Sequence, residues 1–116
     1  MAELNLSFLY RFTKGKETKI KRYISMYLQQ APNLLEKMRQ QLDDKDYSAL
    51  AITAHSLKPQ AEFMGLLDLK NILMKVEALG KAQAQQEELM ALVGKAWQLH
   101  QQAVPKLKRK VEELST

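Results

Sequence analysis

The 116-residue chain contains no cysteine, and this absence excludes disulfide bonds, thiolate metal sites and a cysteine nucleophile. It also lacks any apolar run near the roughly 18 residues that a membrane span requires, and its first residues do not resemble a signal peptide. Gly-rich phosphate loops are missing, as are residues in evident register for a serine hydrolase or a metal site. We therefore expect a cytoplasmic protein that contacts no membrane, binds no cofactor or metal and has no ATP site of its own.

Glycine and proline, which interrupt helices, occur only four and three times. No useful stretch alternates with the period of a strand, whereas apolar residues recur with helical spacing in five segments. These segments are Leu4–Phe12, Lys16–Leu42, Asp46–Met64, Leu67–Leu79 and Glu87–Leu114. Their short connections predict an all-α fold, with a single domain over residues 1–116. Helices joined in this way are expected to form an antiparallel bundle.

Local signals predict where these helices end. The segment Thr13–Gly15 should end the first helix, Asp46 should cap the third, and Gly80 should end the fourth. The first helix is short and apolar, and we expect it to cap one end of the bundle. Three of its apolar residues recur at every fourth position: Leu4, Phe8 and Phe12.

The third segment carries the most informative residue of the chain. Its apolar positions are spaced four, three, four and three apart, as in a helix buried along one seam: Leu50, Ala54, Leu57, Ala61 and Met64. His55 follows Ala54 by one residue, about 100° around a helix, so its imidazole should point off the seam and toward solvent. The neighbours of His55 at helical spacing form a small patch suited to docking a partner: Ala51, Ile52, Pro59 and Glu62.

An exposed imidazole beside a cation has the chemistry of a phosphoryl acceptor. Imidazole has an ordinary pKa near 6.5, so at neutral pH one ring nitrogen usually has a free lone pair that can attack phosphorus. Lys58, three residues after His55, can place its ammonium near the oxygens of such a group. Composition and spacing alone favour an ordinary surface histidine, because one His and one Lys are a weak constellation.

Other residues are given structural roles by their context. His100 stands among glutamines without a ligand-forming partner, and we expect it to be a solvated surface side chain. Five large side chains are interpreted as core or border residues rather than as a cofactor pocket: Met38, Met64, Met74, Met90 and Trp97.

The wider sequence around His55 is similar to a known family. Residues 54–65, AHSLKPQAEFMG, resemble the signature of histidine phosphotransfer domains, in which an exposed His is followed by a hydrophobic residue, Lys, usually Gly, small residues and a later Gly. Residues 27–35 are similar to the family's second helix with its internal proline, and residues 46–50 to the entry of its histidine helix. The pattern fits from about Asn5 to Gly80.

The resemblance implies an antiparallel up-down four-helix bundle with a short additional N-terminal helix. It also implies a phosphorelay carrier of two-component signalling rather than an enzyme. His55 would be the phosphoacceptor, Lys58 the cation beside the phosphoryl group and Gly65 a close-packing glycine at the partner-binding border. The implied partners are receiver domains of a hybrid histidine kinase or a response regulator. Mg²⁺ would arrive with the receiver, and a monomer suffices for an exposed acceptor.

Two residues depart from the family pattern. Pro59 stands where Gly is usual, and Gln60 stands where a small residue is frequent. Pro59 cannot donate a backbone hydrogen bond to the carbonyl of His55, so the helix is expected to bend there. Gln60 either hydrogen-bonds the phosphoryl group or points to solvent. Because of Pro59, a bundle that docks receivers without transferring phosphate is also considered.

A helical adaptor with an unmodified His55 is the alternative from another class. It would bind a protein or a nucleic acid through two basic regions: Arg11, Lys14, Lys16, Lys19, Lys21 and Arg22, then Lys106, Lys108, Arg109 and Lys110. These cations are interrupted by acidic and apolar residues, and no stacking-aromatic platform is apparent in the sequence. Nucleic acid is therefore disfavoured as a partner.

Overall fold

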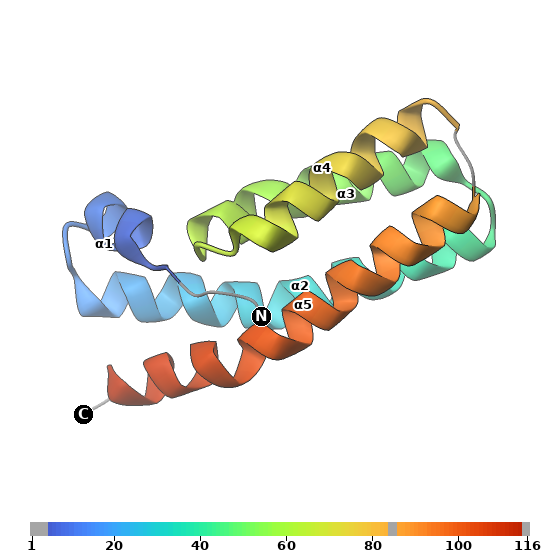
Figure 1. Ribbon diagram of the computed structural model, residues 1–116. Coiled ribbons are helices and arrows are strands. Elements are labelled where there is room, and N and C mark those ends of the chain that lie inside the picture. The colour runs from blue at the N-terminus through green and yellow to red at the C-terminus, as the bar shows by residue number, and fades with distance from the viewer. Residues whose placement is uncertain (1–4, 84–85, 115–116) are drawn as a thin grey trace.

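The structure, a computed structural model, describes residues 5–83 and 86–114, and within them it contains five helices and no strand. The helices are α1 (Ser7–Thr13), α2 (Glu17–Asp43), α3 (Tyr47–Phe63), α4 (Leu67–Lys81) and α5 (Gln86–Glu113). Helices α2 to α5 run alternately up and down an elongated bundle of 47 × 22 × 21 Å, and α1 lies across one end (Figure 1). The predicted fold class is confirmed. None of the described helices is long and apolar enough to cross a membrane.

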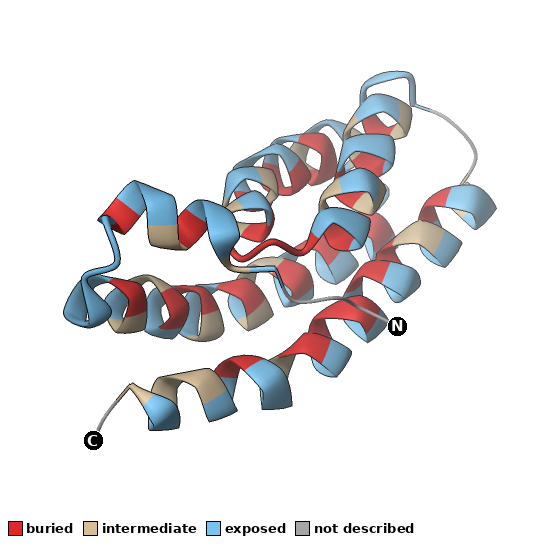
Figure 2. Ribbon diagram, turned by 60° about the vertical axis from the view of Figure 1, so that its left-hand side comes forward, coloured by how far each residue is buried: buried red, intermediate tan, exposed pale blue. Residues whose placement is uncertain are grey.

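Neighbours in the sequence are neighbours in the bundle. Helix α3 packs on both α2 and α4, and α5 closes the bundle by packing on α4 and α2. The buried residues face the bundle axis on every helix, as Figure 2 shows. The predicted seam of α3 is confirmed, because all five of its residues are at most 2% exposed: Leu50, Ala54, Leu57, Ala61 and Met64.

Most of the predicted helix ends are confirmed. After α1 the chain turns through Lys14 and Gly15, both with positive φ (56° and 73°). The Asp46 carboxylate accepts a hydrogen bond from the backbone N–H of Ala49 (3.2 Å), which caps the first turn of α3. Helices α2, α3 and α5 each continue through an internal proline.

The prediction that Gly80 ends the fourth helix is wrong. Helix α4 continues to Lys81, and Gly80 is buried inside it. A Cβ on Gly80 would lie 3.0 Å from the carbonyl oxygen of Tyr47 and 3.1 Å from Cβ of Ala51. This glycine therefore serves the close approach of α3 and α4 rather than a helix end.

Helix α1 covers one end of the bundle, as predicted, but its residues at four-residue spacing do not form its buried face. Leu9 and Thr13 are its buried residues, and the Thr13 hydroxyl donates to the carbonyl of Leu9 (2.8 Å). Phe8 and Phe12 are 44% and 54% exposed, and Leu4 lies outside the described residues. Phe8 and Phe12 do form a stripe along α1, but the neighbouring stripe of Leu9 and Thr13 is the one that is buried.

His100 is buried, contrary to its predicted surface position. It is 2% exposed, and its Nδ1 lies 2.9 Å from the hydroxyl oxygen of Tyr27. Burial lowers the pKa of His100, so its imidazole is held neutral.

The large apolar side chains are divided between core and surface. Met38 and Met64 are buried as predicted, and Trp97, 37% exposed, lies at the border. Met74 and Met90 are about half exposed and lie on the surface, which corrects their interpretation as core or border residues.

Candidate functional site

His55 lies at the middle of α3 and faces solvent. Its side chain is 62% exposed, whereas Ala54 and Leu57 on the seam are completely buried. The seam fixes the rotation of α3 in the bundle, and this rotation in turn presents His55 at the surface. The predicted exposure of His55 is confirmed.

A carboxylate on α4, Glu77, binds the imidazole. Its Oε2 lies 2.8 Å from Nδ1 of His55. The same carboxylate forms an ion pair with Lys58 through Oε1 (3.3 Å) and with Lys81 through Oε2 (3.2 Å). Glu77 is only 12% exposed, so these partners surround a carboxylate that is largely shielded from water.

These partners hold Glu77 in its charged form. Partial burial alone would raise the pKa of Glu77, but the ion pairs with Lys81 and Lys58 and the hydrogen bond with His55 outweigh it and lower the pKa to about 2. An ionised carboxylate can only accept hydrogen bonds, so Nδ1 of His55 is the donor. In the neutral ring the lone pair is therefore on Nε2.

Lys58 lies on the same side of α3 as His55, as its spacing predicts. Its side chain is 26% exposed, and Glu77 bridges it to the imidazole. Gln60 is half-buried and lines a hollow of about 220 Å³ between α2 and α3. Lys58 thus belongs to the charged cluster around Glu77, while Gln60 belongs to an adjacent, more apolar region.

Three of the predicted patch residues are on the surface. Ile52 is 68% exposed, which is unusual for a large aliphatic side chain, and Pro59 is also exposed. Glu62 is half exposed and forms an ion pair with Lys70 (2.9 Å). The face of α3 around His55 therefore combines apolar and charged side chains.

Two other residues assigned to the partner surface are buried, and this part of the prediction is wrong. Ala51 is 2% exposed and is covered by Gly80 of α4. Gly65 is buried too, at φ +69° in the turn between α3 and α4. A Cβ on Gly65 would overlap the backbone carbonyl of Asn5, so its predicted role as a close-packing glycine is confirmed, but it packs against this chain's own N-terminal segment.

An aromatic cluster, which we define as Phe8, Phe12, Tyr23 and Phe63, was not predicted from the sequence. The rings of Phe12 and Phe63 are 5.1 Å apart edge-to-face, and those of Tyr23 and Phe63 are 5.9 Å apart and parallel. Tyr23 and Phe63 also line the hollow that contains Pro59 and Gln60. The cluster joins α1, α2 and α3 into an aromatic surface next to the His55 face.

Glu77 was also missed, although the sequence contains a signal for it. Helices α3 and α4 form a hairpin around Gly65, and His55 and Glu77 are ten residues before and twelve residues after this turn. In antiparallel helices such positions lie level with each other. Glu77 also follows the buried Val76 by one residue, as His55 follows Ala54.

No metal site accompanies this cluster in the part of the chain that the structure describes. Residues 5–83 and 86–114 contain no group of three or more His, Asp or Glu side chains placed to hold an ion.

Comparison with known proteins agrees with this geometry. The family model of the Hpt domain matches residues 22–116, which include α3 to α5 and most of α2 but not α1. No curated protein and no solved structure gave a match. Hpt domains are phosphocarriers, not enzymes, and they exchange phosphoryl groups with receiver domains in two-component phosphorelays. The chain belongs to the Hpt domain family, whose function is histidine phosphotransfer.

Proposed function

We propose that Nε2 of His55 accepts a phosphoryl group from the aspartate of one receiver domain and passes it to the aspartate of another. The observation that carries this proposal is the 2.8 Å hydrogen bond between His55 Nδ1 and Glu77. This bond leaves the free lone pair on Nε2 of a ring that is 62% exposed.

The transfer step requires no proton to move. The Nε2 lone pair attacks phosphorus, an N–P bond forms, the P–O bond to the aspartate breaks, and the carboxylate leaves with the electron pair. Because Nδ1 already carries its proton, the immediate product is a phosphorylated imidazolium. Glu77 lies beside the positive charge that develops on the ring and stabilises it. The reverse step loads the second receiver.

Lys58 and Gln60 are proposed to serve the phosphoryl group. Lys58 is held near His55 by Glu77, and its flexible side chain can turn from the carboxylate to the phosphoryl oxygens. Gln60, which lines the hollow between α2 and α3 together with Pro59, offers amide donors.

The receiver is proposed to dock on the face that surrounds His55. Ile52 on one side and Pro59 on the other provide apolar contact, and Glu62 provides a charge at the rim. The aromatic cluster extends this surface along α1 and α2. The divalent cation that assists transfer would be bound by the acidic pocket of the receiver, and one copy of this chain would suffice.

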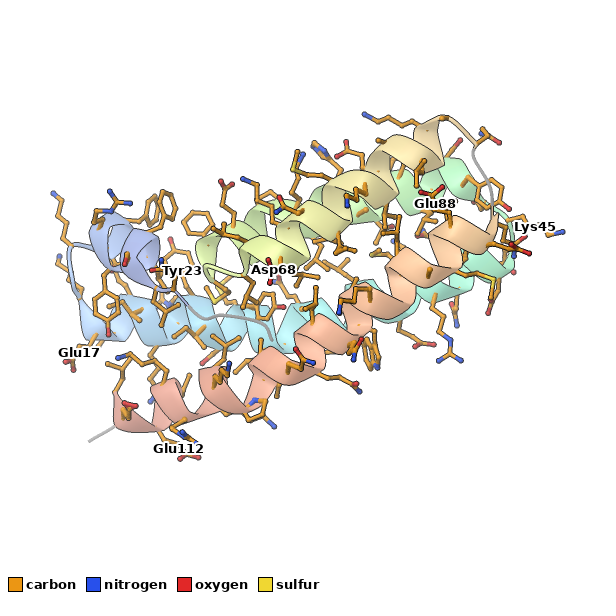
Figure 3. All side chains as sticks on the ribbon, viewed as in Figure 1. Glu17, Tyr23, Lys45, Asp68, Glu88 and Glu112 are labelled. Atoms are coloured by element: carbon orange, nitrogen blue, oxygen red, sulfur yellow. The ribbon has the colours of Figure 1, made fainter. Side chains whose placement is uncertain are left out.

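A specific observation favours a second candidate, an adaptor that binds an acidic protein through basic residues. The two basic regions, far apart in the sequence, meet at one end of the bundle, where Lys110 lies 5.3 Å from the centre of the Tyr10 ring. Figure 3 places Glu17 and Glu112 at this end. Ten cations and three acids, Glu113 included, give it a net charge of +7, so the remainder of the +5 chain carries −2.

The proposal is tested by incubating the protein with a panel of phosphorylated receiver domains and Mg²⁺, followed by intact-mass measurement at alkaline pH. We expect a gain of one phosphate that is lost in His55→Gln while the helical circular dichroism persists. Retained labelling in His55→Gln would contradict the assignment of His55. Receiver binding without transfer would indicate a docking module, and salt-sensitive binding that is indifferent to His55 would indicate the adaptor.

A further inference from the structure

Glu77 has three partners, although its hydrogen bond with His55 would be enough to orient the imidazole. His55 and Lys58 both come from α3, whereas Lys81 follows Glu77 by one turn on α4 and shares Oε2 with His55. Each carboxylate oxygen therefore has a cation of its own, because Lys58 is on Oε1 and Lys81 is on Oε2.

The charges around His55 show what this third partner can contribute. With the ring neutral, Lys58, Lys81 and Glu77 together carry +1. A phosphoryl group adds about two negative charges, and the phosphorylated imidazolium adds one positive charge. The phosphorylated site is then close to neutral with Lys81 and has one excess negative charge without it.

Phosphorylation also changes the partners of Glu77. When Lys58 turns to the phosphoryl oxygens, Oε1 of Glu77 loses its cation. A carboxylate that is 12% exposed cannot replace this partner fully with water. Lys81 does not have to move, since it reaches Glu77 from the same helix.

We propose that Lys81 is a positioning residue, which holds Glu77 against Nδ1 of His55 while Lys58 is recruited to the phosphoryl group. This inference rests on the proposed function and assigns Lys81 an effect on how readily His55 is phosphorylated. It acts through Glu77 and does not touch the phosphoryl group. The lowered pKa of Glu77, to which Lys81 contributes, is consistent with this role.

An ordinary surface ion pair would behave differently. Lys81 is 70% exposed, and pairs of this kind at i,i+4 stabilise a helix only slightly. Such a pair would shift the melting temperature slightly and leave the chemistry of His55 unchanged. The test therefore measures the rate at which His55 is phosphorylated.

Phosphoramidate, a small donor that needs no receiver, provides this test. Its P–N bond breaks, ammonia leaves, and an N–P bond forms on histidine. We expect Lys81→Gln to slow the labelling of His55 about two- to fivefold, the range expected for an exposed ion pair. Lys81→Arg should restore the rate, and Lys75→Gln, which removes an exposed charge elsewhere on α4, should label like the wild type.

Two further measurements decide how Lys81 acts. In a Glu77→Gln background, Lys81→Gln should have no further effect on the rate, and in the phosphorylated protein Lys81→Gln should shift the ¹⁵N resonance of Nδ1. Equal rates in wild type and Lys81→Gln would overturn the inference and leave the proposed function intact. An undiminished effect in Glu77→Gln would overturn the role through Glu77. Failure of the wild type to form phosphohistidine at His55 would overturn the proposed function itself.

Discussion

Glu77 determines which nitrogen of His55 is available for chemistry. An exposed histidine without a partner exchanges its proton between both nitrogens, and each nitrogen is then a nucleophile for part of the time. The Glu77 carboxylate, 2.8 Å from Nδ1, fixes one tautomer and can stabilise the imidazolium that phosphorylation produces. The reactivity of the site thus depends on a residue of another helix.

Replacement of this carboxylate should slow phosphorylation. We expect Glu77→Gln to reduce the rate of labelling of His55 by phosphoramidate roughly five- to tenfold, because a charge-assisted hydrogen bond becomes a neutral one. Glu88→Gln, which removes an exposed charge on α5, is the control and should label normally. Labelling of Glu77→Gln at the wild-type rate would show that the charge of Glu77 does not contribute.

The buried His100 should make stability depend on pH. Burial lowers its pKa in the folded protein, so below the ordinary value of about 6.5 the unfolded chain binds a proton that the folded chain does not bind. This contribution to stability is fully present above pH 6.5 and is lost as the pH falls toward the lowered pKa. Between pH 7.5 and 5.5 we expect the free energy of unfolding of the wild type to fall because of this group.

Urea unfolding at the two pH values measures this loss. His100→Gln should show a flatter dependence on pH than the wild type. If the slope disappeared in His55→Gln and persisted in His100→Gln, the pH dependence would come from His55, and this result would contradict the prediction.

At the scale of elements, the turn between α3 and α4 brings His55 and Glu77 level. It uses Gly65 at φ +69°, against the backbone of Asn5. We expect Gly65→Ala to destabilise the protein by roughly 1–3 kcal/mol, because a side chain disfavours this conformation and the N-terminal segment must move. Gly94→Ala in α5 is the opposite case, because its Cβ would meet no atom within 4 Å. That variant should be more stable by roughly 0.5–1 kcal/mol.

Chemical denaturation of the two variants checks this pair of predictions. Hydrogen exchange at the amides of α1 would in addition report whether Gly65→Ala releases this helix. Equal stability of Gly65→Ala and the wild type would mean that the turn tolerates a side chain and that the packing on Asn5 contributes little.

Features that depend only on residues close together in the sequence were predictable. The seam from Leu50 to Met64 depends on spacing within one helix, and the cap of α3 depends on Asp46 and the next three residues. Exposure of His55 followed from its position one residue after the seam. The Hpt resemblance then supplied the role of the residue and the topology of the bundle.

Features that depend on contacts between elements were predicted less well. The exposure of Phe8 and Phe12 could not be predicted, because the sequence of α1 alone does not show which of its stripes the rest of the bundle will cover. His100 continues the core spacing of α5, between Ala96 and Ala103, but its polar side chain and glutamine neighbours outweighed this signal. The partner that makes burial of His100 acceptable, the hydroxyl of Tyr27, lies 73 residues away.

At the scale of the whole molecule, the face of His55 and the basic end are distinct surfaces, and the aromatic cluster of α1, α2 and α3 connects them. The first is partly apolar and surrounds the acceptor, whereas the second carries a net charge of +7 at the end formed by α1, the start of α2 and the end of α5 (Figure 1). Docking of a receiver should therefore depend on the first surface. The two surfaces can be altered independently.

Ile52 tests the docking surface. It is 68% exposed, so Ile52→Ser should leave the fold and the labelling by phosphoramidate unchanged. Transfer from a cognate phosphorylated receiver should fall roughly tenfold at subsaturating receiver, because loss of a central apolar contact costs on the order of 1 to 2 kcal/mol of binding. Met74→Ser, which alters a half-exposed apolar residue of α4, is the matched control. Undiminished transfer to Ile52→Ser would mean that the receiver docks elsewhere, and equal loss in both variants would mean that the effect is not specific to Ile52.

The central claim is that Nε2 of His55 carries the phosphoryl group, and NMR of the ¹⁵N-labelled imidazole tests it most directly. The phosphorylated protein at alkaline pH should show ¹⁵N–³¹P coupling at Nε2 of His55, with the hydrogen bond from Nδ1 to Glu77 retained. Coupling at Nδ1, or phosphate attached to any residue other than His55, would contradict the account.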